Sequence, residues 1–453
     1  MIGLASIAGD PLLRRLMVAG RVSDPELERV LTVARHALLD WACGTNPSGA
    51  ELVDFFGALA EQCFLNEYAF AQSDDECAAV ERIATQLSER ASAGGYCGYI
   101  PPAWLIATAA YRPLHTLAGT EALLGRAWPA AIERLLVLQV REPLEERAIA
   151  TALPALTPIE DRVSRAVQAQ YEANPYPRWV MAAPAATPVA IGDDIRGKFP
   201  LAPYRPRGAA EHLDILVAGC GTGAHPIETC RRYAGARVLA VDLSRASLAY
   251  AARKTRALGL PIAYAQADIL ALGALDRRFD LIEASGSLQC LADPRAGWRV
   301  LLGLLAPGGL MQVGLYSKLA RTDINAARAY IKGRRYDGTA DDIRRFRQEA
   351  LAWPDGTPGR SVTRLGDFYS TSGCRDLLFH VEEYQHDLPE IAAFIAEEGL
   401  TFLGFDLDIR VLHAYAAANP DDPAMTNLAR WHRFEVANPG IFAAMYQFWV
   451  QKT

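Results

Sequence analysis

The stretch Leu213–Ala224 joins a short apolar run to a cluster of glycines. Residues 215–218 are all apolar, which is typical of a strand that is buried on both faces of a parallel sheet. The run Gly219-Cys-Gly-Thr-Gly223 follows at once, and residues 227–233 then continue as a helix. A strand, a glycine turn and a helix form the opening unit of nucleotide-binding α/β folds. Because glycine has no side chain, such a turn lets backbone N–H groups approach a ligand closely.

The glycine spacing alone leaves two kinds of nucleotide open. The run Gly219–Gly223 reads G-x-G-x-G, and with Ala224 it also satisfies the dinucleotide fingerprint G-x-G-x-x-G/A. The next predicted strand, residues 236–241, runs into Asp242, whose carboxylate can accept hydrogen bonds from two ribose hydroxyls. Nicotinamide dinucleotides and S-adenosyl cofactors both carry such a ribose, so these residues do not separate them.

Later segments separate the alternatives. A third predicted strand, residues 262–265, leads to Asp268, whose carboxylate can accept a hydrogen bond from an adenine amino group. A fourth predicted strand, residues 279–283, leads into a loop and a helix. The sequence Ala306-Pro-Gly-Gly309 then precedes a fifth strand at residues 310–316. Several motifs in a fixed order are more specific than one glycine turn.

In order and spacing, the motifs between about residues 213 and 316 resemble those of class I S-adenosylmethionine-dependent methyltransferases. The resemblance implies a Rossmann-like, seven-stranded α/β core and S-adenosyl-L-methionine as the cofactor. It also implies a cofactor site formed by the glycine turn, the acidic ends of the second and third strands, and the loop after the fourth. The residues implied are Gly219, Cys220, Gly221, Gly223, Asp242, Leu243, Asp268, Ile269 and Ser285.

Two of these carboxylates have a structural alternative. Asp242 precedes Ser244 and a helical run, so it can instead be the N-cap of that helix. Asp268 can likewise serve as a turn or cap residue. Both interpretations stay open for both residues.

Residues 1–150 predict an all-α domain. Pro25–Trp41 has apolar residues at helical spacing, with Asp24 as N-cap, and further helical stretches follow between proline and glycine breaks. The segment Gln62–Tyr68 resembles the helical region before the methyltransferase core in a bacterial group, some members of which carry tetratricopeptide repeats. Its aromatic side chains are interpreted either as core or as a surface that docks an acceptor or partner.

Residues 151–212 are rich in proline, which predicts a lead-in rather than packed core. They contain Tyr171-Glu-Ala-Asn-Pro-Tyr-Pro-Arg-Trp179, which resembles a Tyr-Glu-x-Asn-Pro-Tyr-Pro-Arg-Trp signature of the same bacterial group. As structure, the prolines fix an extended path and Trp179 packs on the core. As function, four side chains roof the cofactor pocket, with arginine or tyrosine reaching the methionine carboxylate. These four are Tyr171, Tyr176, Arg178 and Trp179.

Residues 213–453 are predicted to form the methyltransferase domain. Residues 401–406 and 445–450 supply the sixth and seventh strands, the last of them antiparallel. About seventy residues lie between the fifth strand and the next predicted helix, a surplus that is typical of a lid. We therefore predict a lid-like insertion at about residues 318–387.

The acceptor side is less defined. In the bacterial group the loop after the fourth strand often reads Gly-x-Leu-His-His, which offers a base, whereas here Gly286-Ser-Leu is followed by Gln289 and Cys290. Glutamine can orient an acceptor but cannot take a proton at neutral pH. The resemblance also brings residues 367–386 close to the acceptor. The catalytic candidates are Gln289, Cys290, Tyr369 and His380, with Arg375 and His386 as further acceptor-side residues. No general base is assigned.

Composition argues against several other functions. A formal net charge of -6 argues against a broad nucleic-acid surface. Eight cysteines occur singly, without a Cys-x-x-Cys or Cys/His cluster, so we expect free thiols in a reducing cytoplasm and no metal site. No apolar run reaches the ~18 residues that a membrane span needs, so a cytoplasmic protein is expected.

Three functions stay open. The first is methyl transfer from S-adenosylmethionine to an unidentified acceptor, either a small molecule or a protein. The second is methylation of a protein or peptide side chain that docks on the helical domain. The third is a regulatory or scaffold protein that binds the cofactor without catalysis.

Overall fold

The computed structural model describes residues 7–44, 50–93, 99–185, 187–208 and 212–453. The chain divides into two compact units, each assembled from three separate stretches. Unit 1 comprises residues 1–148, 177–181 and 326–379, and unit 2 comprises residues 149–176, 182–325 and 380–453. Helices α8 and α14 each contribute residues to both units.

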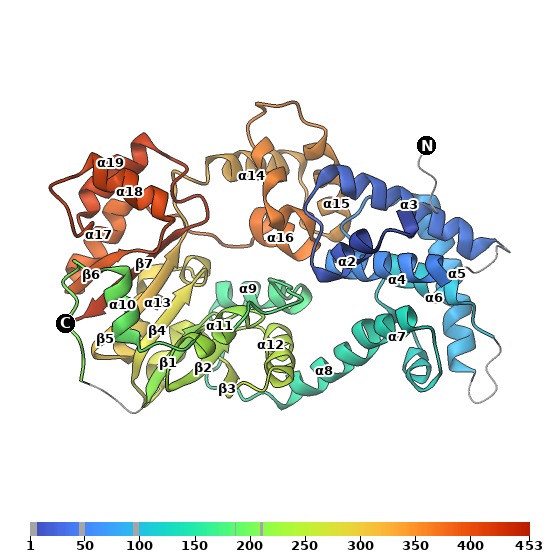
Figure 1. Ribbon diagram of the computed structural model, residues 1–453, viewed down its shortest axis with the longest axis horizontal. Helices are drawn as coiled ribbons and strands as arrows, with labels where there is room; N and C mark the ends of the chain where they lie inside the picture. The colour runs from blue at the N-terminus through green and yellow to red at the C-terminus, as the bar shows by residue number, and fades with distance from the viewer. Residues whose placement is uncertain (1–6, 45–49, 94–98, 186, 209–211) are drawn as a thin grey trace. The chain divides into compact units, whose positions relative to one another are not determined.

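Unit 2 is built on a seven-stranded sheet in the order β3-β2-β1-β4-β5-β7-β6 (Figure 1). Strands β1 to β5 pair in parallel, whereas β7 runs antiparallel to both of its neighbours, β5 and β6. This topology confirms the predicted seven-stranded methyltransferase core with an antiparallel last strand. The strands are β1 (Leu213–Ala218), β2 (Ala236–Asp242), β3 (Ile262–Gln266), β4 (Phe279–Ser285), β5 (Leu305–Leu315), β6 (Leu400–Phe405) and β7 (Tyr446–Lys452).

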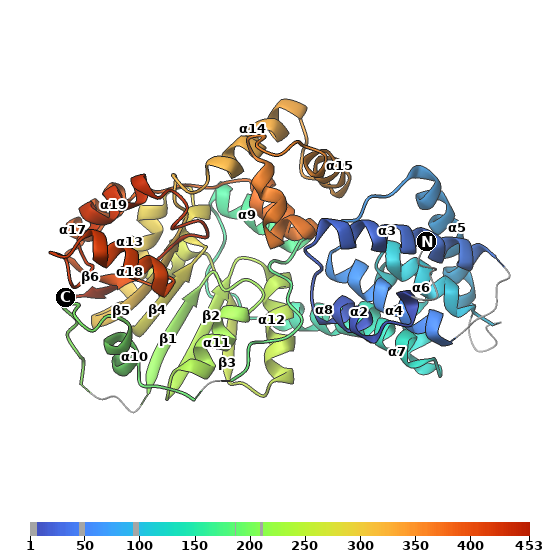
Figure 2. The ribbon, with the colours of Figure 1, turned by 45° about the horizontal axis from the view of Figure 1, so that its top comes forward.

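Helices cover both faces of this sheet (Figure 2). Along β1, Leu216 and Ala218 enter the hydrophobic core on one face, and Ile215 and Val217 enter the core on the other. A strand between two cores needs apolar residues at every position, which explains the unbroken apolar run in the sequence. The helices of unit 2 are α9 (Arg162–Ala173), α10 (Ile191–Lys198), α11 (Ala224–Arg232), α12 (Arg245–Ala257), α13 (Pro294–Leu304), α17 (Leu388–Glu397), α18 (Ile409–Ala418) and α19 (Leu428–Ala437).

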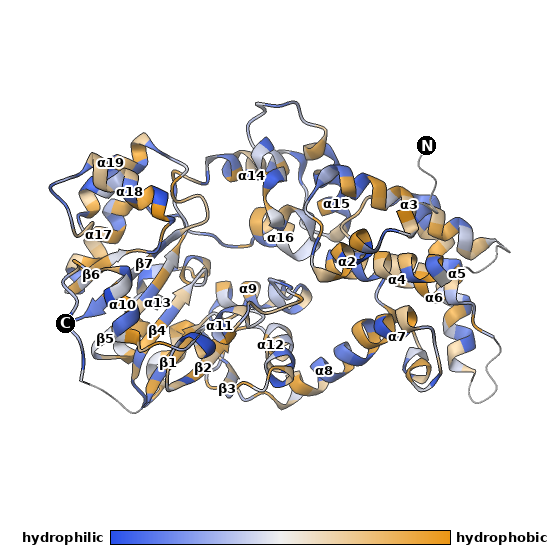
Figure 3. Cartoon of the chain, in the orientation of Figure 1, coloured by the Kyte–Doolittle hydropathy of each residue, from blue (hydrophilic) through white to orange (hydrophobic). Residues whose placement is uncertain are grey.

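Unit 1 consists of helices in its described residues, which confirms the predicted helical region. The side chain of Asp24 accepts a hydrogen bond from the N–H of Leu27 at 2.8 Å, and Pro25 occupies the first turn, as predicted. Hydrophobic and hydrophilic residues alternate along these helices (Figure 3), as expected where one side of each faces a core. The helices are α2 (Pro11–Ala19), α3 (Pro25–Cys43), α4 (Ala50–Leu65), α5 (Asp74–Ser92), α6 (Pro102–Tyr111), α7 (Ala130–Leu136), α8 (Glu142–Ala152), α14 (Thr322–Arg334), α15 (Ala340–Leu351) and α16 (Thr371–Phe379).

The segment predicted as a lid-like insertion is divided between the units, because residues 326–379 belong to unit 1. A buried ion pair joins this segment to the N-terminal helices. The guanidinium of Arg347 donates to Glu28 at 2.7 Å and to the main-chain carbonyl of Phe368 at 2.6 Å. Both charged side chains are almost fully buried, at 0% and 4% exposure. Loss of either partner therefore leaves a charge inside the protein.

The lead-in contains helices α9 and α10 and also borders the sheet. Ala155 forms an isolated parallel bridge with Gln266 at the end of β3, and the Leu156 N–H donates to the same residue at 2.9 Å. Part of the proline-rich segment is therefore ordered against the edge strand.

We predict that Glu28→Ala destabilises the protein by about 3–5 kcal/mol, because it leaves the Arg347 guanidinium buried without a counter-charge. Urea denaturation measures this loss of unfolding free energy. Glu28→Leu combined with Arg347→Met should cost less, because neither charge then remains inside. Glu26→Ala is the matched control, since it breaks the exposed pair of Glu26 and Arg29 and should cost no more than about 1 kcal/mol. A loss for Glu28→Ala as small as that of the control would contradict this account.

Candidate active site

The glycine turn lies between β1 and α11, and its backbone requires glycine. Gly219, Gly221 and Gly223 have φ angles of 78°, 52° and 87°, in the left-handed region that other residues rarely adopt. The space around these glycines also leaves no room for a side chain. A Cβ atom on Gly219 would lie 2.2 Å from the Cβ of Ser287, and one on Gly223 would lie 2.5 Å from the Cβ of Ala251. The turn is therefore a narrow backbone cradle with closely packed walls.

The carboxylate of Asp242 ties this turn to the end of β2. One oxygen accepts the N–H of Gly221 at 2.8 Å, and the other accepts the N–H of Ser244 at 2.9 Å. Burial raises the pKa of Asp242, and the backbone donors oppose that rise. The N-cap of α12 is Ser244, whose side chain accepts from Ser247, so Asp242 is not the cap. Each oxygen keeps acceptor capacity beyond its one backbone donor.

Asp268 makes the cap contact that the sequence left open. Its side chain accepts the N–H of Leu270 at 3.0 Å at the start of the 3₁₀ helix η4 (Ile269–Ala274). Its own N–H donates to the hydroxyl of Thr157 in the lead-in at 2.8 Å. Asp268 is 2% exposed, and Ile269 belongs to a hydrophobic core. A structural role accounts for these contacts, and adenine binding by this pair stays a prediction.

Ser285 ends β4, and its hydroxyl donates to the sulfur of Met445 at 3.4 Å. Two positions further on, the hydroxyl of Ser287 donates to the carbonyl of Ala218 at 2.8 Å. The loop after β4 is thereby fastened to the last residue of β1, beside the glycine turn.

A polar pair next to the glycine turn was not predicted from the sequence, and in it Glu283 is buried and His225 is partly exposed. Glu283 of β4 lies 3.1 Å from His225 of α11 and accepts the hydroxyl of Thr229 at 2.5 Å. Burial alone would lower the pKa of His225, but the Glu283 carboxylate outweighs it and the pKa is raised. The interruption of an apolar strand by a glutamate at position 283 was the only sequence signal.

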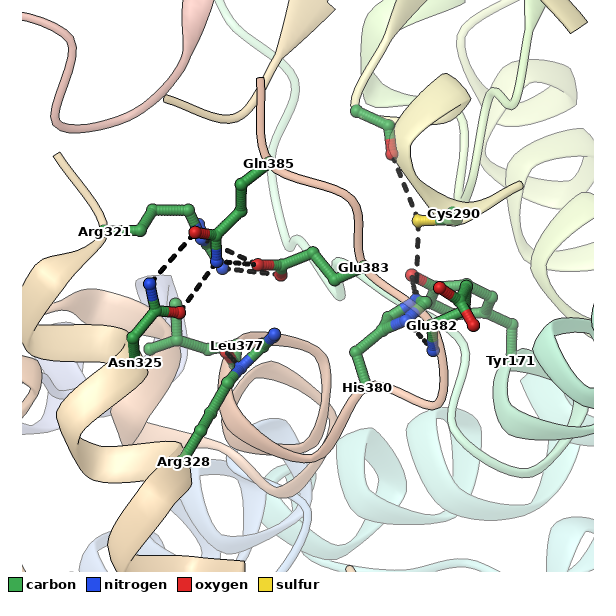
Figure 4. A network of polar contacts seen from close by, with 11 residues as sticks. Tyr171, Cys290, Arg321, Asn325, Arg328, Leu377, His380, Glu382, Glu383 and Gln385 are labelled. Atoms are coloured by element: carbon green, nitrogen blue, oxygen red, sulfur yellow. Dashed lines mark hydrogen bonds and ion pairs between the residues drawn. The ribbon is translucent and has the colours of Figure 1, made fainter. Parts of the chain in front are cut away.

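The loop after β4 brings three predicted site residues together (Figure 4). The Nε2 atom of His380 lies 3.1 Å from the hydroxyl of Tyr171 and 3.5 Å from the sulfur of Cys290. Gln289 is fully buried, and within the described residues neither polar atom of its amide has a hydrogen-bond partner. A buried amide with both groups unsatisfied is costly, which marks this position for a ligand.

The other predicted residues of the signature divide between the units. Tyr176 belongs to unit 2, whereas Arg178 and Trp179 belong to unit 1. In unit 1 the Arg178 guanidinium lies 3.3 Å from the carboxylate of Glu67 and over the ring of Phe64, at 5.3 Å from its centroid. The predicted segment Gln62–Tyr68 therefore contacts the predicted arginine. Glu67 and Tyr68 both have positive φ, which is a strained arrangement for two consecutive non-glycine residues.

The structure places three further acceptor-side candidates, Tyr369, His386 and Arg375. Tyr369 lies in unit 1, is 1% exposed, and donates its hydroxyl to the carbonyl of Thr363 at 2.8 Å. His386 lies in unit 2, and burial lowers its pKa to about 4. Its N–H donates to the carbonyl of Tyr316 at 2.8 Å, which fastens the main chain there to the end of β5. Arg375 lies within α16 of unit 1.

Across residues 7–453, apart from the gaps given above, no group of three or more His, Cys, Asp or Glu side chains is arranged to hold a metal ion. In the same described part of the chain, every helix is too short or too polar to cross a bilayer.

Residues 215–309 match a family model described as a methyltransferase domain. An uncharacterized protein of Synechococcus is 28% identical over 291 residues, which are 61% of this chain and 68% of that protein. The demethylmenaquinone methyltransferase of Thermus thermophilus is 35% identical over 99 residues, which are 22% of this chain and 45% of that enzyme. Among solved structures, PKMT2 from Rickettsia typhi in complex with AdoHcy has a TM-score of 0.41 at 18% identity, over 57% of this chain and 51% of that one. The chain thus spans about half of the Thermus and Rickettsia proteins.

The sheet topology and the matched residues define the fold of S-adenosylmethionine-dependent methyltransferases. The cofactor of this class is S-adenosylmethionine. The C-terminal half of this chain is a class I S-adenosylmethionine-dependent methyltransferase domain, and a helical region precedes it.

We predict that Gly219→Ala destabilises the protein more than Gly259→Ala does. Both glycines have positive φ, so each alanine carries a conformational cost of about 1–2 kcal/mol. Only at Gly219 does the new Cβ also collide with Ser287, whereas nothing lies within 4 Å at Gly259. Urea denaturation of both variants measures the difference. Equal losses of unfolding free energy in the two variants would show that Ser287 moves aside without cost.

The ion pair of His225 and Glu283 predicts a pH-dependent stability. Because the pKa of His225 is raised on folding, its stabilising contribution is complete below the unfolded pKa of about 6.5 and is lost as pH rises through the folded pKa. His225→Gln should therefore cost most stability near pH 6 and progressively less towards pH 9. Urea denaturation across this range is the measurement, with the exposed His413→Gln on α18 as control. A constant difference between wild type and His225→Gln would refute the prediction.

Proposed function

We propose that the protein transfers the methyl group of S-adenosylmethionine to an acceptor that lies against the loop after β4. The observation that carries the cofactor part is the carboxylate of Asp242, fixed by the N–H groups of Gly221 and Ser244 beside the glycine turn. A carboxylate held in this way offers its remaining lone pairs to a ribose without further reorganisation.

The residues of this edge of the sheet fit the cofactor. The glycine turn suits the amino-acid end because its backbone has left-handed φ angles and carries no side chains, and the carboxylate beside it suits the ribose. The proposed contacts are Gly219, Cys220, Gly221 and Gly223 for the amino-acid end, Asp242 and Leu243 for the ribose, Asp268 and Ile269 for adenine, and Ser285 near the sulfonium. Of the residues predicted as the roof, Tyr176 belongs to unit 2 and is proposed to lie over the cofactor.

The bound cofactor supplies a methyl carbon that is activated by the positive charge on sulfur. Since that charge disappears during in-line transfer, the protein needs no oxyanion hole. Its task is to align the acceptor atom, to exclude water and, where the acceptor carries a proton, to remove it.

Gln289 supports the position of the acceptor. Its buried amide has one donor group and one acceptor group without partners, which an acceptor molecule with both kinds of group would satisfy. The sulfur of its neighbour Cys290 lies 3.5 Å from Nε2 of His380.

We predict that Asp242→Asn weakens the binding of S-adenosylhomocysteine by about 10- to 100-fold, because one of the two carboxylate oxygens is replaced by an amide nitrogen and the charge is lost. Isothermal titration calorimetry measures the affinity. Asp276→Asn, an exposed carboxylate in the loop between η4 and β4, is the matched control and should bind as the wild type does. Unchanged affinity in Asp242→Asn would place the nucleoside elsewhere. Failure of the wild type to bind S-adenosylhomocysteine would refute the function itself.

A further inference from the structure

The segment of residues 380–386 is bonded through its main chain to the loop after β4 and to the residues after β5. The N–H of Tyr384 donates to the carbonyl of Gln289 at 2.8 Å. Further along, the N–H of His386 donates to Tyr316 at 2.8 Å, and the N–H of Lys318 donates back to His386 at 2.9 Å. Main-chain hydrogen bonds thus hold this segment against the proposed acceptor site.

The hydrogen bonds of His380 fix which of its nitrogens carries the proton. The main-chain N–H of Glu382 donates to Nδ1 at 3.1 Å. Because Nδ1 accepts, the ring is neutral and its proton is on Nε2. His380 is therefore a hydrogen-bond donor at Nε2, and it can take up a proton only by giving up the contact with Glu382.

Within the described residues, Tyr171 and Cys290 both place an acceptor near this Nε2–H. The hydroxyl oxygen of Tyr171 lies at 3.1 Å and the sulfur of Cys290 at 3.5 Å. The oxygen is the better acceptor, and its distance is within the normal range for an N–H···O bond. Tyr171 therefore receives the donor, and a donor on a phenol oxygen favours the phenolate over the phenol.

Tyr171 is held in this place by its own helix. Gln170, the preceding residue of α9, is 3% exposed and accepts the N–H of Val381 at 3.2 Å. Adjacent residues of α9 thus bind adjacent residues of the segment, so the phenol and the imidazole are positioned by two parallel contacts. Their ring centroids are 5.8 Å apart.

We propose that Tyr171 takes the proton of the methyl acceptor and that His380 is the residue that positions and polarises it. This inference rests on the proposed function. It gives Tyr171 a place on the acceptor side rather than in the roof over the cofactor, and it replaces the missing histidine base of the loop after β4.

The acceptor atom X, which carries a hydrogen, forms a bond to the methyl carbon while the carbon–sulfur bond breaks and its electron pair stays on sulfur. The X–H proton passes to the phenolate oxygen of Tyr171, which becomes a phenol and later loses the proton to solvent. The acceptors that need this step are hydroxyl, thiol and ammonium groups, so the inferred substrate class is a heteroatom that bears a proton.

Titratable groups on neighbouring elements of unit 2 lie around Tyr171. Cys290 comes from the loop after β4, and His380 and Glu382 come from the segment beside it. Glu172 follows Tyr171 on α9, but its carboxylate accepts the N–H groups of Arg245 and Ala246 at the start of α12. Its charge is therefore engaged at a helix N-terminus.

The test follows the ionisation of Tyr171 in the full-length protein labelled with 3-fluorotyrosine, by ¹⁹F NMR. The resonance is assigned by its loss in Tyr171→Phe. We expect His380→Leu to raise the midpoint by about one pH unit, a tenfold smaller phenolate fraction at neutral pH. His380→Gln should restore most of the shift, because its amide N–H can take the place of Nε2–H. His413→Leu, on α18, is the control and should leave the midpoint unchanged.

A Tyr171 midpoint that is the same in the wild type and in His380→Leu overturns the inference. So does a change confined to Cys290, seen as altered alkylation by iodoacetamide with Tyr171 unmoved. Calorimetry of the wild type with S-adenosylhomocysteine separates the two levels: no binding refutes the proposed function and this inference together. Binding with an unmoved Tyr171 refutes the role of Tyr171 alone.

Discussion

The hydrogen bonds of the Asp242 carboxylate organise the cofactor end of unit 2. They join the N–H of Gly221 to the N–H of Ser244, and so connect the glycine turn with the start of α12. The turn is also anchored on β2 from the other side, since the N–H groups of Gly219 and Cys220 both donate to the carbonyl of Val241. One strand end therefore sets the position of the turn, the helix and the carboxylate together. Burying a charge at this point is costly, and the backbone donors offset part of that cost.

The sequence predicted the fold well because its signals are local. A buried strand, the glycines after it and the acidic residue at the next strand end lie within short stretches, and each has a direct physical reason. The resemblance carried by these motifs implied a seven-stranded core with an antiparallel last strand, and the structure adds the order of the strands. Asp268 shows the limit of such reasoning, because a cap and a ligand need the same residue type. Its contact with Leu270 shows that the cap is formed, and adenine binding by the same carboxylate stays a prediction.

The acceptor side could not be predicted in the same way. Cys290 and His380 are 90 positions apart in the chain, and they meet only because main-chain hydrogen bonds guide the second along the loop of the first. Main-chain hydrogen bonds of this kind can form with almost any residue type, so the sequence does not reveal them. The pair of His225 and Glu283 was not predicted either, because neither residue belongs to a recognisable motif. Tyr369 is buried and its hydroxyl donates to the carbonyl of Thr363, and its place on the acceptor side stays a prediction.

The discontinuity of unit 1 has a consequence for how the protein is made. Its core needs residues 326–379, which leave the ribosome only after most of the sheet of unit 2 has been synthesised. Glu28 is made early, and its partner Arg347 arrives some three hundred residues later, at a separation of 319 positions. During translation the N-terminal helices therefore have an uncompensated carboxylate and an incomplete core until residues 326–379 are made. Chaperones protect exposed apolar surface of this kind from aggregation. For the same reason the N-terminal helices do not form a separable domain. A chain cut between its two halves would leave the segment around Arg347 without the helices that it packs against.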